Sequence, residues 1–424
     1  MTAVESVVQR AGRVRVWSSS LSSPPAIILG GGANALSVAR LLGKRGVKVY
    51  AINGAKEHVC YSRFAESLSV PSESSLERAW TRYLLSDDSN HLRGAVLLAC
   101  SDRAIQILAE HHAELGRKFR LDAMNPTAQL CMLNKLCTYR AATAAGVATP
   151  RYWTPQNDRQ LEEVRNELVY PLVVKPELSH ESQKRFGEKL FIARDFSELM
   201  QLFRKVLQGG VDVMLVEMIP GGDDLLCSYY TYLDENGRPL FHFTKRIIRR
   251  YPAVHGIGCC HVTDWIPELI PVSLRLFEHV GLRGLANVEF KRDPRDGVLK
   301  LIECNARFTA ANCLVADSGF DLAMLVYSRL TERPQDPLIH YRVGKRLWYP
   351  FEDFLAWRDM PNASRSPFYR WLLSHRHPAT LPFFWWSDPV PTIIAEGRRL
   401  GEIIERRARK VRGWLSRIWS RSAL

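Results

Sequence analysis

Leu285-Ala-Asn-Val-Glu-Phe-Lys291 and Leu299-Lys-Leu-Ile-Glu-Cys-Asn-Ala-Arg307 are two alternating stretches that decide the fold of this chain. Between them lies Asp293-Pro-Arg-Asp-Gly297, whose residue types are typical of a tight turn. The pattern therefore predicts an antiparallel hairpin. If the hairpin closes symmetrically about residue 296, Glu289 lies opposite Glu303.

The facing glutamates indicate a site for a divalent cation. Like charges directly across a ladder destabilise it, so we expect a cation between the two carboxylates. Asn305 and Arg307 share a face with Glu303, because side chains two residues apart on a strand point the same way. Two carboxylates and an amide oxygen suit Mg²⁺, and an arginine suits phosphate oxygens. The spacing is also compatible with a solvated hairpin face that carries ordinary charges.

The composition indicates a globular protein. With 424 residues, 46% of them hydrophobic, the chain can bury a large core, and its length favours two or three domains or subdomains. We expect neither a signal peptide nor a transmembrane helix, because no apolar run is long enough. The nine cysteines show no paired metal-binding motifs, and those in apolar segments (Cys60, Cys100, Cys131, Cys137) are interpreted as reduced thiols. This pattern favours a cytoplasmic location.

The formal net charge of +14 is concentrated in part near the C-terminus. From Ala395 onward, nine arginines and lysines stand against three glutamates, and apolar residues recur at helical spacing. The segment predicts a basic amphipathic helix. It could pack on the main body, or it could contact the inner face of a membrane through Trp414 and Trp419. A nucleic-acid partner is not expected, because no aromatic and basic RNA- or DNA-binding module accompanies the helix.

The N-terminal part predicts a small α/β domain over residues 26–125, after a tail of residues 1–25. A short strand runs into Gly30-Gly-Gly-Ala-Asn34, a helix follows, and a second strand ends at Ile52-Asn53-Gly54. The glycines meet a loose dinucleotide-binding spacing. A nicotinamide site would need an acidic residue after the second strand, where this chain has Asn53, so an NAD-dependent oxidoreductase is disfavoured.

The middle of the chain places lysines at element ends. Asn134-Lys135 lies inside a helical run over residues 130–145, and Tyr170-Pro-Leu-Val-Val-Lys-Pro176 is a strand that carries Lys175 near its end. After a helix over residues 196–207, the chain becomes rich in strands, and we expect antiparallel hairpins. Residues beyond about 330 show weak periodicity and suggest no chemistry.

Five motifs, in order along the chain, resemble those of the ATP-grasp superfamily. They are Asn134-Lys135, Val174-Lys175-Pro176, Val216-Glu-Met-Ile-Pro-Gly-Gly-Asp-Asp224, Val288-Glu289-Phe290 and Ile302-Glu-Cys-Asn-Ala-Arg307. The resemblance covers roughly residues 26–330 and is greatest to the carboxylate-amine ligase branch, which includes D-aspartate ligase and proteins related to carbamoyl-phosphate synthase. It implies an α/β plus α+β chain: a Rossmann-like pre-ATP-grasp domain (26–125), then an ATP-grasp domain (126–330) with subdomains 126–212 and 213–330, then a C-terminal extension (331–424).

The resemblance also implies a role for each matching residue. ATP and Mg²⁺, or alternatively Mn²⁺, would lie between the two subdomains. The implied metal ligands are Glu289, Glu303 and Asn305; the implied ATP-binding residues are Lys135, Lys175, Glu217, Met218, Ile219 and Asp224, with Asp223 as a competitor of Asp224; the implied catalytic residues are Lys175 and Arg307. Dimers are common in the family, so a homodimer is an expectation.

One departure from the family concerns the flap over the phosphates, which many members build from glycines. Here the stretch Glu177-Leu-Ser-His-Glu-Ser-Gln-Lys-Arg-Phe-Gly-Glu-Lys189 keeps only Gly187. Basic residues could supply charge in place of main-chain amides, and Lys189 is therefore a further candidate for ATP binding, together with His180, Lys184 and Arg185. These residues could equally belong to a solvated loop.

Two functions follow from the resemblance. The first is an amide-forming ligase that transfers the γ-phosphate of ATP to a small-molecule carboxylate, giving an acylphosphate that an amine attacks. Arg249 and Arg250, in a basic cluster with Lys245 and Arg246, are the candidates for binding the carboxylate, although a structural charge cluster is an alternative. The second is a catalytically reduced ATP-binding scaffold, recruited to a membrane by the basic tail.

Overall fold

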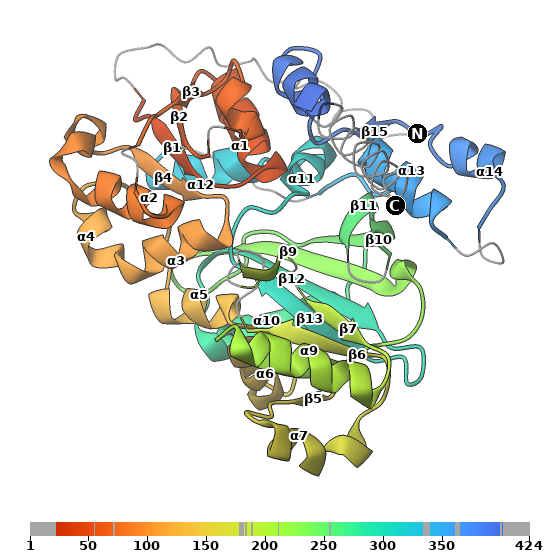
Figure 1. Cartoon of the computed structure of the whole chain (residues 1–424). Helices are drawn as coiled ribbons and strands as arrows, with labels where there is room; N and C mark the ends of the chain where they lie inside the picture. The colour runs from red at the N-terminus through yellow and green to blue at the C-terminus, as the bar shows by residue number, and fades with distance from the viewer. Residues whose placement is uncertain are drawn as a thin grey trace, which may run out of the picture.

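The chain forms three β-sheets with helices packed around them (Figure 1). The computed structural model describes residues 23–54, 56–70, 73–177, 182, 185–187, 190–210, 212–253, 256–333, 340–360, 365–398 and 401. The described part of the chain contains no helix with the length and apolar character that a bilayer crossing requires.

The N-terminal domain is a parallel sheet between helices. Its strands are β1 (Ala26–Leu29), β2 (Val49–Ile52), β3 (Glu66–Ser67) and β4 (Val96–Ala99), in the order β3-β2-β1-β4. Ala26 and Ile28 pack with α1 (Ala33–Lys44), whereas Ile27 and Leu29 pack with α2 (Leu76–Leu85) and α3 (Asp102–Glu110). The strand is buried on both faces, which explains its continuous apolar sequence. Shorter helical segments complete the domain: η1 (His58–Tyr61), η2 (Asp87–Leu92) and α4 (His112–Gly116).

A small antiparallel sheet follows, with the order β5-β8-β6-β7. Its strands are β5 (Tyr152–Trp153), β6 (Leu172–Pro176), β7 (Phe191–Ala193) and β8 (Val213–Glu217), and its helical segments are α7 (Asp158–Glu163), η3 (Arg165–Glu167) and α9 (Phe196–Gln208). The sequence assigned β8 to the second ATP-grasp subdomain, but β8 pairs with β5 and β6. β8 therefore belongs to the small sheet and not to the sheet that follows it.

The largest sheet has seven strands in the order β13-β12-β9-β10-β11-β14-β15. The strands are β9 (Leu226–Leu233), β10 (Phe243–Tyr251), β11 (Ile257–Thr263), β12 (Gly284–Arg292), β13 (Leu299–Asn305), β14 (Arg346–Trp348) and β15 (Ala379–Thr380). One face packs with α10 (Leu269–Val280), α5 (Pro126–Leu133) and α6 (Lys135–Ala144). On the other face, residues of β9 and β10 share a core with α1, α11 (Asn312–Ser318) and α12 (Leu322–Leu330). The N-terminal domain and the large sheet are thus joined by one continuous apolar core.

The helical run predicted over residues 130–145 is two helices. Asn134 leaves the helical conformation (φ −85°, ψ 117°), and its side chain accepts a hydrogen bond from the Cys137 amide, so it ends α5 and caps α6. Periodicity could not reveal the break, because apolar residues recur on both sides of it. The prediction of reduced thiols was also wrong for two cysteines, since Cys131 and Cys137 form a disulfide across this junction. Cys60 and Cys100 are free.

The C-terminal extension belongs to the main body. β14 adds to the edge of the large sheet beside β11, and β15 adds to β14. The extension also contains α13 (Pro350–Arg358), α14 (Phe368–Leu373) and a helix over residues 390–398. Its Asp388 forms a buried ion pair with Arg40 of α1, with 2.9 Å between Nε and Oδ2. Most of the predicted basic helix, including Trp414 and Trp419, lies outside the described residues.

Candidate active site

The predicted hairpin is present, and its register brings two acidic side chains together. β12 and β13 are antiparallel, with Glu289 opposite Glu303 and Asn287 opposite Asn305, as symmetry about residue 296 requires. Closer to the turn the register shifts by one, so that Phe290 pairs with Leu301 and Ile302 is the extra residue of a bulge. The sequence predicted the facing glutamates but not the bulge.

Glu303, Asn305 and Arg307 share one face of β13 and its continuation. They are partly exposed, whereas Cys304 and Ala306 between them are buried in the core beneath the sheet. The Asn305 side-chain amide donates to Glu303 Oε1 at 3.2 Å, which leaves the Asn305 side-chain oxygen to accept other contacts. The three polar side chains therefore lie on the same side of the hairpin.

The two glutamates differ in their electrostatic surroundings. Burial and the Glu303 charge raise the pKa of Glu289. Burial also disfavours the charged form of Glu303, but the positive charges of Lys135 and Lys175 outweigh it and lower the Glu303 pKa. In the described part of the chain, no side chain forms a hydrogen bond or ion pair with Glu289. Glu289 is partly exposed and lies opposite a second carboxylate, an arrangement that favours a bound cation. Two carboxylates with an amide oxygen are a donor set that fits Mg²⁺.

Lys175 reaches the same hairpin from the small sheet. Its side chain is 6% exposed, and its Nζ donates to the carbonyl of Ile302, the bulged residue, at 2.9 Å. The Tyr139 hydroxyl donates to the same carbonyl at 3.3 Å, and its ring lies 5.1 Å from the Lys175 Nζ. Burial, together with the Lys135 charge and against the opposing charges of Glu303 and Glu289, lowers the pKa of Lys175 to about 7. A nearby phosphate would favour the charged form.

Lys135 is the first residue of α6 and lies beside the start of the flap segment. Its main-chain amide donates to the carbonyl of Glu177 at 3.0 Å, and the neighbouring Asn134 side chain donates to Glu177 Oε2 at 2.8 Å. The break between α5 and α6 thus places the backbone of Lys135 beside the residue that follows the strand carrying Lys175. Of the flap candidates, Lys189, His180 and Lys184 lie outside the described residues, whereas Arg185 is exposed.

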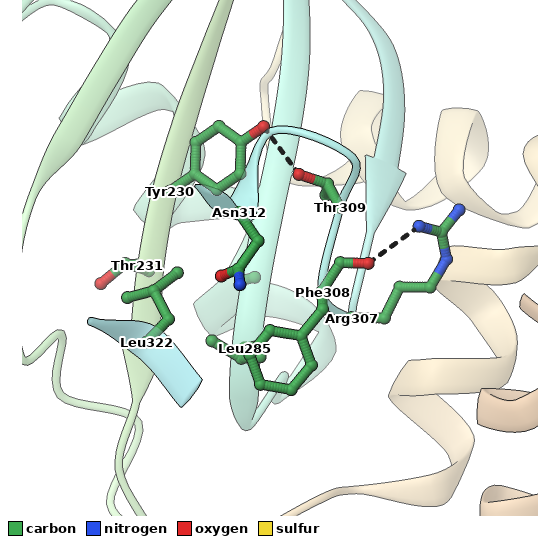
Figure 2. Close-up of a pocket in the computed structure, with 9 residues that line it drawn as sticks. Tyr230, Thr231, Leu285, Arg307, Phe308, Thr309, Asn312 and Leu322 are labelled. Carbon is green, nitrogen blue, oxygen red and sulfur yellow. Dashed lines mark hydrogen bonds between the residues drawn. The ribbon is translucent and has the colours of Figure 1, made fainter. Parts of the chain in front are cut away.

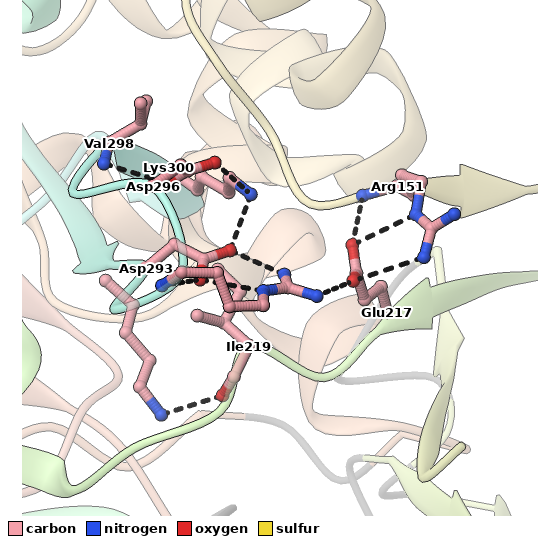
Figure 3. A network of polar contacts seen from close by, with 9 residues as sticks. Arg151, Glu217, Ile219, Asp293, Asp296, Val298 and Lys300 are labelled. Carbon is pink, nitrogen blue, oxygen red and sulfur yellow. Dashed lines mark hydrogen bonds and ion pairs between the residues drawn. The ribbon is translucent and has the colours of Figure 1, made fainter. Parts of the chain in front are cut away.

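The segment that follows β8 is held by charged side chains (Figure 3). Glu217 is 4% exposed and lies between Arg151 and Arg295, with 2.5 Å between the Arg295 Nη1 and Glu217 Oε1. Burial disfavours the Glu217 charge, but these arginines lower its pKa overall. Because its carboxylate is already bound, Glu217 can contact a ligand mainly through its backbone. The Lys291 Nζ donates to the carbonyl of Ile219 at 2.9 Å and fixes the next part of this segment, past the half-buried Met218.

Asp223 and Asp224 have different surroundings, which the sequence could not distinguish. The Asp223 carboxylate accepts hydrogen bonds from the backbone amide and side chain of Arg250, at 3.0 and 2.8 Å. Asp224 is exposed, and the described residues include no ion-pair partner for it. Asp224 therefore keeps its acceptor capacity for ligand hydroxyls, whereas Asp223 uses part of its own on Arg250.

Arg249 and Arg250 lie in separate environments. The Arg249 guanidinium donates to both oxygens of Asp353 in α13, at 2.6 and 3.1 Å, and its side chain is 14% exposed. Sequence reasoning assigned it to the substrate, but the Asp353 carboxylate occupies it, so we correct the role of Arg249 to holding the extension. Arg250 binds Asp223, and its charge also favours the ionised form of Glu289. Arg250 therefore lies near the acidic pair.

Arg307 connects the hairpin to the N-terminal domain. Its Nε donates to Oδ1 of Asp102, the first residue of α3, at 2.5 Å, and its Nη1 donates to the Phe308 carbonyl at 3.2 Å. Figure 2 shows Arg307 directed away from the small pocket that Tyr230, Thr309 and Phe308 line. The guanidinium thus lies at the boundary between the acidic hairpin and the glycine turn of the N-terminal sheet.

Lys245 lies closer to the acidic pair in the sheet than Arg249, which the sequence favoured for substrate binding. Ser228 pairs with Glu289 on one side and with Lys245 on the other, so Glu303, Glu289, Ser228 and Lys245 form one row across the sheet. The Lys245 Nζ is buried and donates to Ser228 Oγ at 3.1 Å and to His261 Nδ1 at 3.2 Å. The row is visible only in the pairing of strands, which local sequence does not give.

The His261 side chain accepts the Lys245 bond as a neutral ring. Its Nε2 lies 2.8 Å from the Gly258 carbonyl, which can only accept, so the ring proton is on Nε2 and Nδ1 is an acceptor. Burial and the Lys245 charge lower the His261 pKa. Burial lowers the Lys245 pKa as well, and the Glu289 charge opposes this shift. Lys245 is therefore a cation beside the acidic pair. Among the described residues, its Nζ is bonded to neutral side chains and to no carboxylate.

The chain is similar in sequence to an enzyme and in structure to several others. It is 25% identical over 264 residues to a D-aspartate ligase of Enterococcus faecium (strain Aus0004), a match that covers 60% of this chain and 62% of that protein. The chain thus spans less than two thirds of that relative. No family model matches the sequence.

Solved structures of the ATP-grasp fold match most of the chain. An L-amino acid ligase from Bacillus licheniformis has a TM-score of 0.56 at 17% identity, covering 73% of this chain and 75% of its own. The biotin carboxylase domain of 2-oxoglutarate carboxylase from Hydrogenobacter thermophilus, in complex with MgADP, ADP and bicarbonate, has a TM-score of 0.59 at 15% identity, covering 76% and 73%. These likenesses confirm the predicted fold.

Proposed function

We propose that this chain, which has the ATP-grasp fold, is an ATP-dependent carboxylate-amine ligase. The observation that carries the proposal is the pairing of Glu289 with Glu303 on a hairpin reached by Lys175. This combination offers hard anionic ligands for Mg²⁺ and a buried cation for phosphate in one place. The likeness to a D-aspartate ligase supports the same reaction class, with small carboxylates and amines as substrates.

The nucleotide would lie between the small sheet and the large one. Glu289, Glu303 and Asn305 would hold Mg²⁺, which supplies charge neutralisation of the phosphate oxygens when bound. Lys135 and Lys175 would contact the phosphates, and Lys189 is a further candidate. The backbone of residues 217–219 would contact adenine, and Asp224 the ribose. These roles agree with the buried, bound state of the Glu217 carboxylate and with the exposure of Asp224.

The reaction would proceed by two displacements. A carboxylate oxygen of the substrate attacks the γ-phosphorus of ATP, the bond to the β,γ-bridging oxygen breaks, and ADP leaves, which gives an acylphosphate. The amine then attacks the carbonyl carbon, phosphate leaves, and the amine loses a proton. Arg307 and Lys245 would stabilise the charge on the transferred phosphoryl group, and Arg250 the substrate carboxylate. No side-chain nucleophile is needed.

The proposal predicts an isotope transfer. With both oxygens of the substrate carboxylate labelled with ¹⁸O, one label should be found in the inorganic phosphate that is released with ADP. Candidate carboxylates and amines would first be screened as mixtures for ADP release, with Glu303→Gln as a variant that should abolish it. Release of unlabelled phosphate in a productive reaction would contradict the acylphosphate. Tight MgATP binding without turnover for any mixture would favour the scaffold.

We also propose a cytoplasmic location, with a homodimer and a peripheral membrane contact as associations to test. α14 supports the membrane contact: Phe368, Tyr369, Leu372 and Leu373 are 50–56% exposed, and residues 361–387 contain no acidic residue. Binding to vesicles that contain anionic lipid, lost on deletion of residues 395–424 or on Leu372→Asp, would support it. Light scattering would report the dimer.

A further inference from the structure

Two cysteines enclose the first phosphate-binding candidate. Cys131 near the end of α5 and Cys137 in the first turn of α6 form a disulfide with 5.2 Å between their Cα atoms. The bridge closes a loop of six residue steps that contains Asn134 and Lys135. The other seven cysteines are free, and six of these are buried. The bridge therefore spans the junction between α5 and α6, which contains the proposed phosphate-binding residue Lys135.

The two bridged cysteines are less buried than most cysteines of the chain. Both Cys131 and Cys137 are partly exposed. Burial raises the thiol pKa of each of the six buried cysteines, which keeps them protonated and unreactive. Cys137, in contrast, is the third residue of the ten-residue helix α6 and follows Lys135 by two residues. A helix N-terminus stabilises a thiolate, so Cys137 is the better leaving and attacking sulfur of the pair.

The bridge is connected to Lys135 by a short series of hydrogen bonds. The Cys137 amide donates to the Asn134 side-chain oxygen at 2.8 Å, and the Asn134 side-chain amide donates to Glu177 at 2.8 Å. The Lys135 amide donates to the Glu177 carbonyl at 3.0 Å. On the other side, the Thr138 hydroxyl donates to the Cys131 carbonyl at 3.1 Å. A change at the two sulfurs therefore acts on the backbone that holds Lys135 beside Glu177, next to the end of the Lys175 strand.

We propose that Cys131 and Cys137 form a reversible thiol–disulfide modification site, and that its bridged form holds Lys135 in position for nucleotide phosphate. The chemical partners are low-molecular-weight thiols and their disulfides. The effect on nucleotide rests on the proposed function, whereas the modification itself does not. Without the bridge, the interrupted turn at Asn134 keeps its hydrogen bonds but gains backbone freedom, so that Lys135 spends less time beside the phosphates.

The exchange balances with two equivalents of thiol. An external thiolate attacks Cys131 Sγ, the bond between the two protein sulfurs breaks, and Cys137 leaves as the thiolate that the α6 N-terminus stabilises. A second external thiolate attacks the external sulfur of the mixed disulfide, which releases the Cys131 thiolate and an external disulfide. Protonation of both cysteines completes the reduction. Oxidation is the reverse, with the external disulfide as the oxidant.

The test uses the full chain in thiol–disulfide buffers of stepped ratio, with two readouts. A thiol reagent applied to the folded protein should label Cys60 throughout and Cys131 and Cys137 only after reduction. MgATP affinity should fall about 3- to 10-fold on reduction, and exchange of the Lys135 amide hydrogen should become faster by a similar factor. Cys131→Ser with Cys137→Ser should behave as the reduced chain in every buffer, and Cys60→Ser should keep the full response.

Three outcomes separate this proposal from the proposed function. If the two thiols stay free in oxidising buffer, or stay bridged at every ratio, the modification site is wrong. If they cycle and neither the MgATP affinity nor the Lys135 exchange rate changes, the coupling to Lys135 is wrong. If the exchange rate changes but neither form binds MgATP, the modification site stands and the proposed function fails.

Discussion

Single charges in the site are distinguished by what already binds them. Lys300 and Arg295 bond to Asp293, and Arg249 bonds to Asp353, so these cations are committed to the fold. Lys175 and Lys245, in contrast, are buried cations whose bonded partners are neutral. A buried cation without a bonded anion is costly for folding, and a bound phosphate would remove that cost.

Replacing Lys175 should therefore weaken nucleotide binding without unfolding the protein. We expect Lys175→Met to lower MgATP affinity about 10- to 100-fold, because the charge is lost while the buried stem is kept. Isothermal titration calorimetry measures the affinity, and thermal unfolding checks the fold. Lys118→Met is the matched control, since the Lys118 Nζ also donates to a backbone carbonyl, that of Ser86 in the N-terminal domain. An equal loss in both variants would contradict the role of Lys175.

Asp122 should make the stability depend on pH in a predictable direction. Burial raises its pKa to about 6, and the Tyr232 hydroxyl, which donates to Oδ1 at 2.5 Å, partly opposes the shift. A raised folded pKa contributes stability below the unfolded value near 4, and this contribution is lost as pH rises through 6. Between pH 4 and pH 7, Asp122→Asn should gain up to about 3 kcal/mol in unfolding free energy relative to the native chain.

The measurement for Asp122 is chemical denaturation of both chains at a series of pH values. Tyr232→Phe should shift the loss of stability to higher pH, because it removes a hydrogen bond that favours the carboxylate. A constant difference between Asp122→Asn and the native chain across this range would contradict the prediction.

At the scale of elements, the acidic hairpin depends on its turn. Asp293 is fully buried and accepts bonds from Arg295 and Lys300, and Arg295 also binds Glu217 beside the small sheet. These bonds lower the Asp293 pKa, with Arg295 as the main cause. The turn thus fixes both the end of the hairpin and the segment proposed to contact adenine.

Asp293→Ala should disturb both the end of the hairpin and the segment that follows β8. We expect a loss of about 2 kcal/mol in unfolding free energy, because two cations lose their buried acceptor, and a weaker binding of MgATP. Asp296→Ala is a suitable control, since Asp296 occupies the same turn but is exposed. If both variants lose the same stability, the buried network is not the cause.

The sequence predicted elements where local pattern and pairing agree, and missed those set by distant partners. A symmetric turn was enough to align Glu289 with Glu303. The extra residue at Ile302 leaves no mark in an alternating pattern, and β14 and β15, with three and two residues, are too short to show one. The partner of Arg249 lies 104 residues away at Asp353, so no local reading could identify it.

At the scale of the whole molecule, the extension completes the body. Asp353 binds Arg249, His375 and Trp371, and Asp388 binds Arg40, with both acids buried. Deleting residues 331–424 would leave Arg40 and Arg249 without their carboxylates and uncover the edge of β11.

We therefore expect a chain truncated after residue 330 to aggregate or to unfold at much lower denaturant concentration. Asp353→Asn keeps the shape of the side chain but leaves the Arg249 guanidinium without its carboxylate. It should lower the free energy of unfolding by about 3 kcal/mol. Size-exclusion chromatography and urea unfolding measure these effects. A truncated chain of native stability would show that the extension is a separate unit.

The extension has a mechanical consequence for ligand entry. Arg40 and Arg249 lie in the N-terminal domain and in the large sheet, and the same C-terminal segment supplies a buried acid to each. A hinge between these two bodies would have to break at least one of these buried ion pairs. The small sheet is joined to the rest through the segment after β8 and through contacts such as that of Lys175 with Ile302. Opening for the nucleotide should therefore be a rotation of the small sheet alone, with the surface that receives the acceptor held fixed.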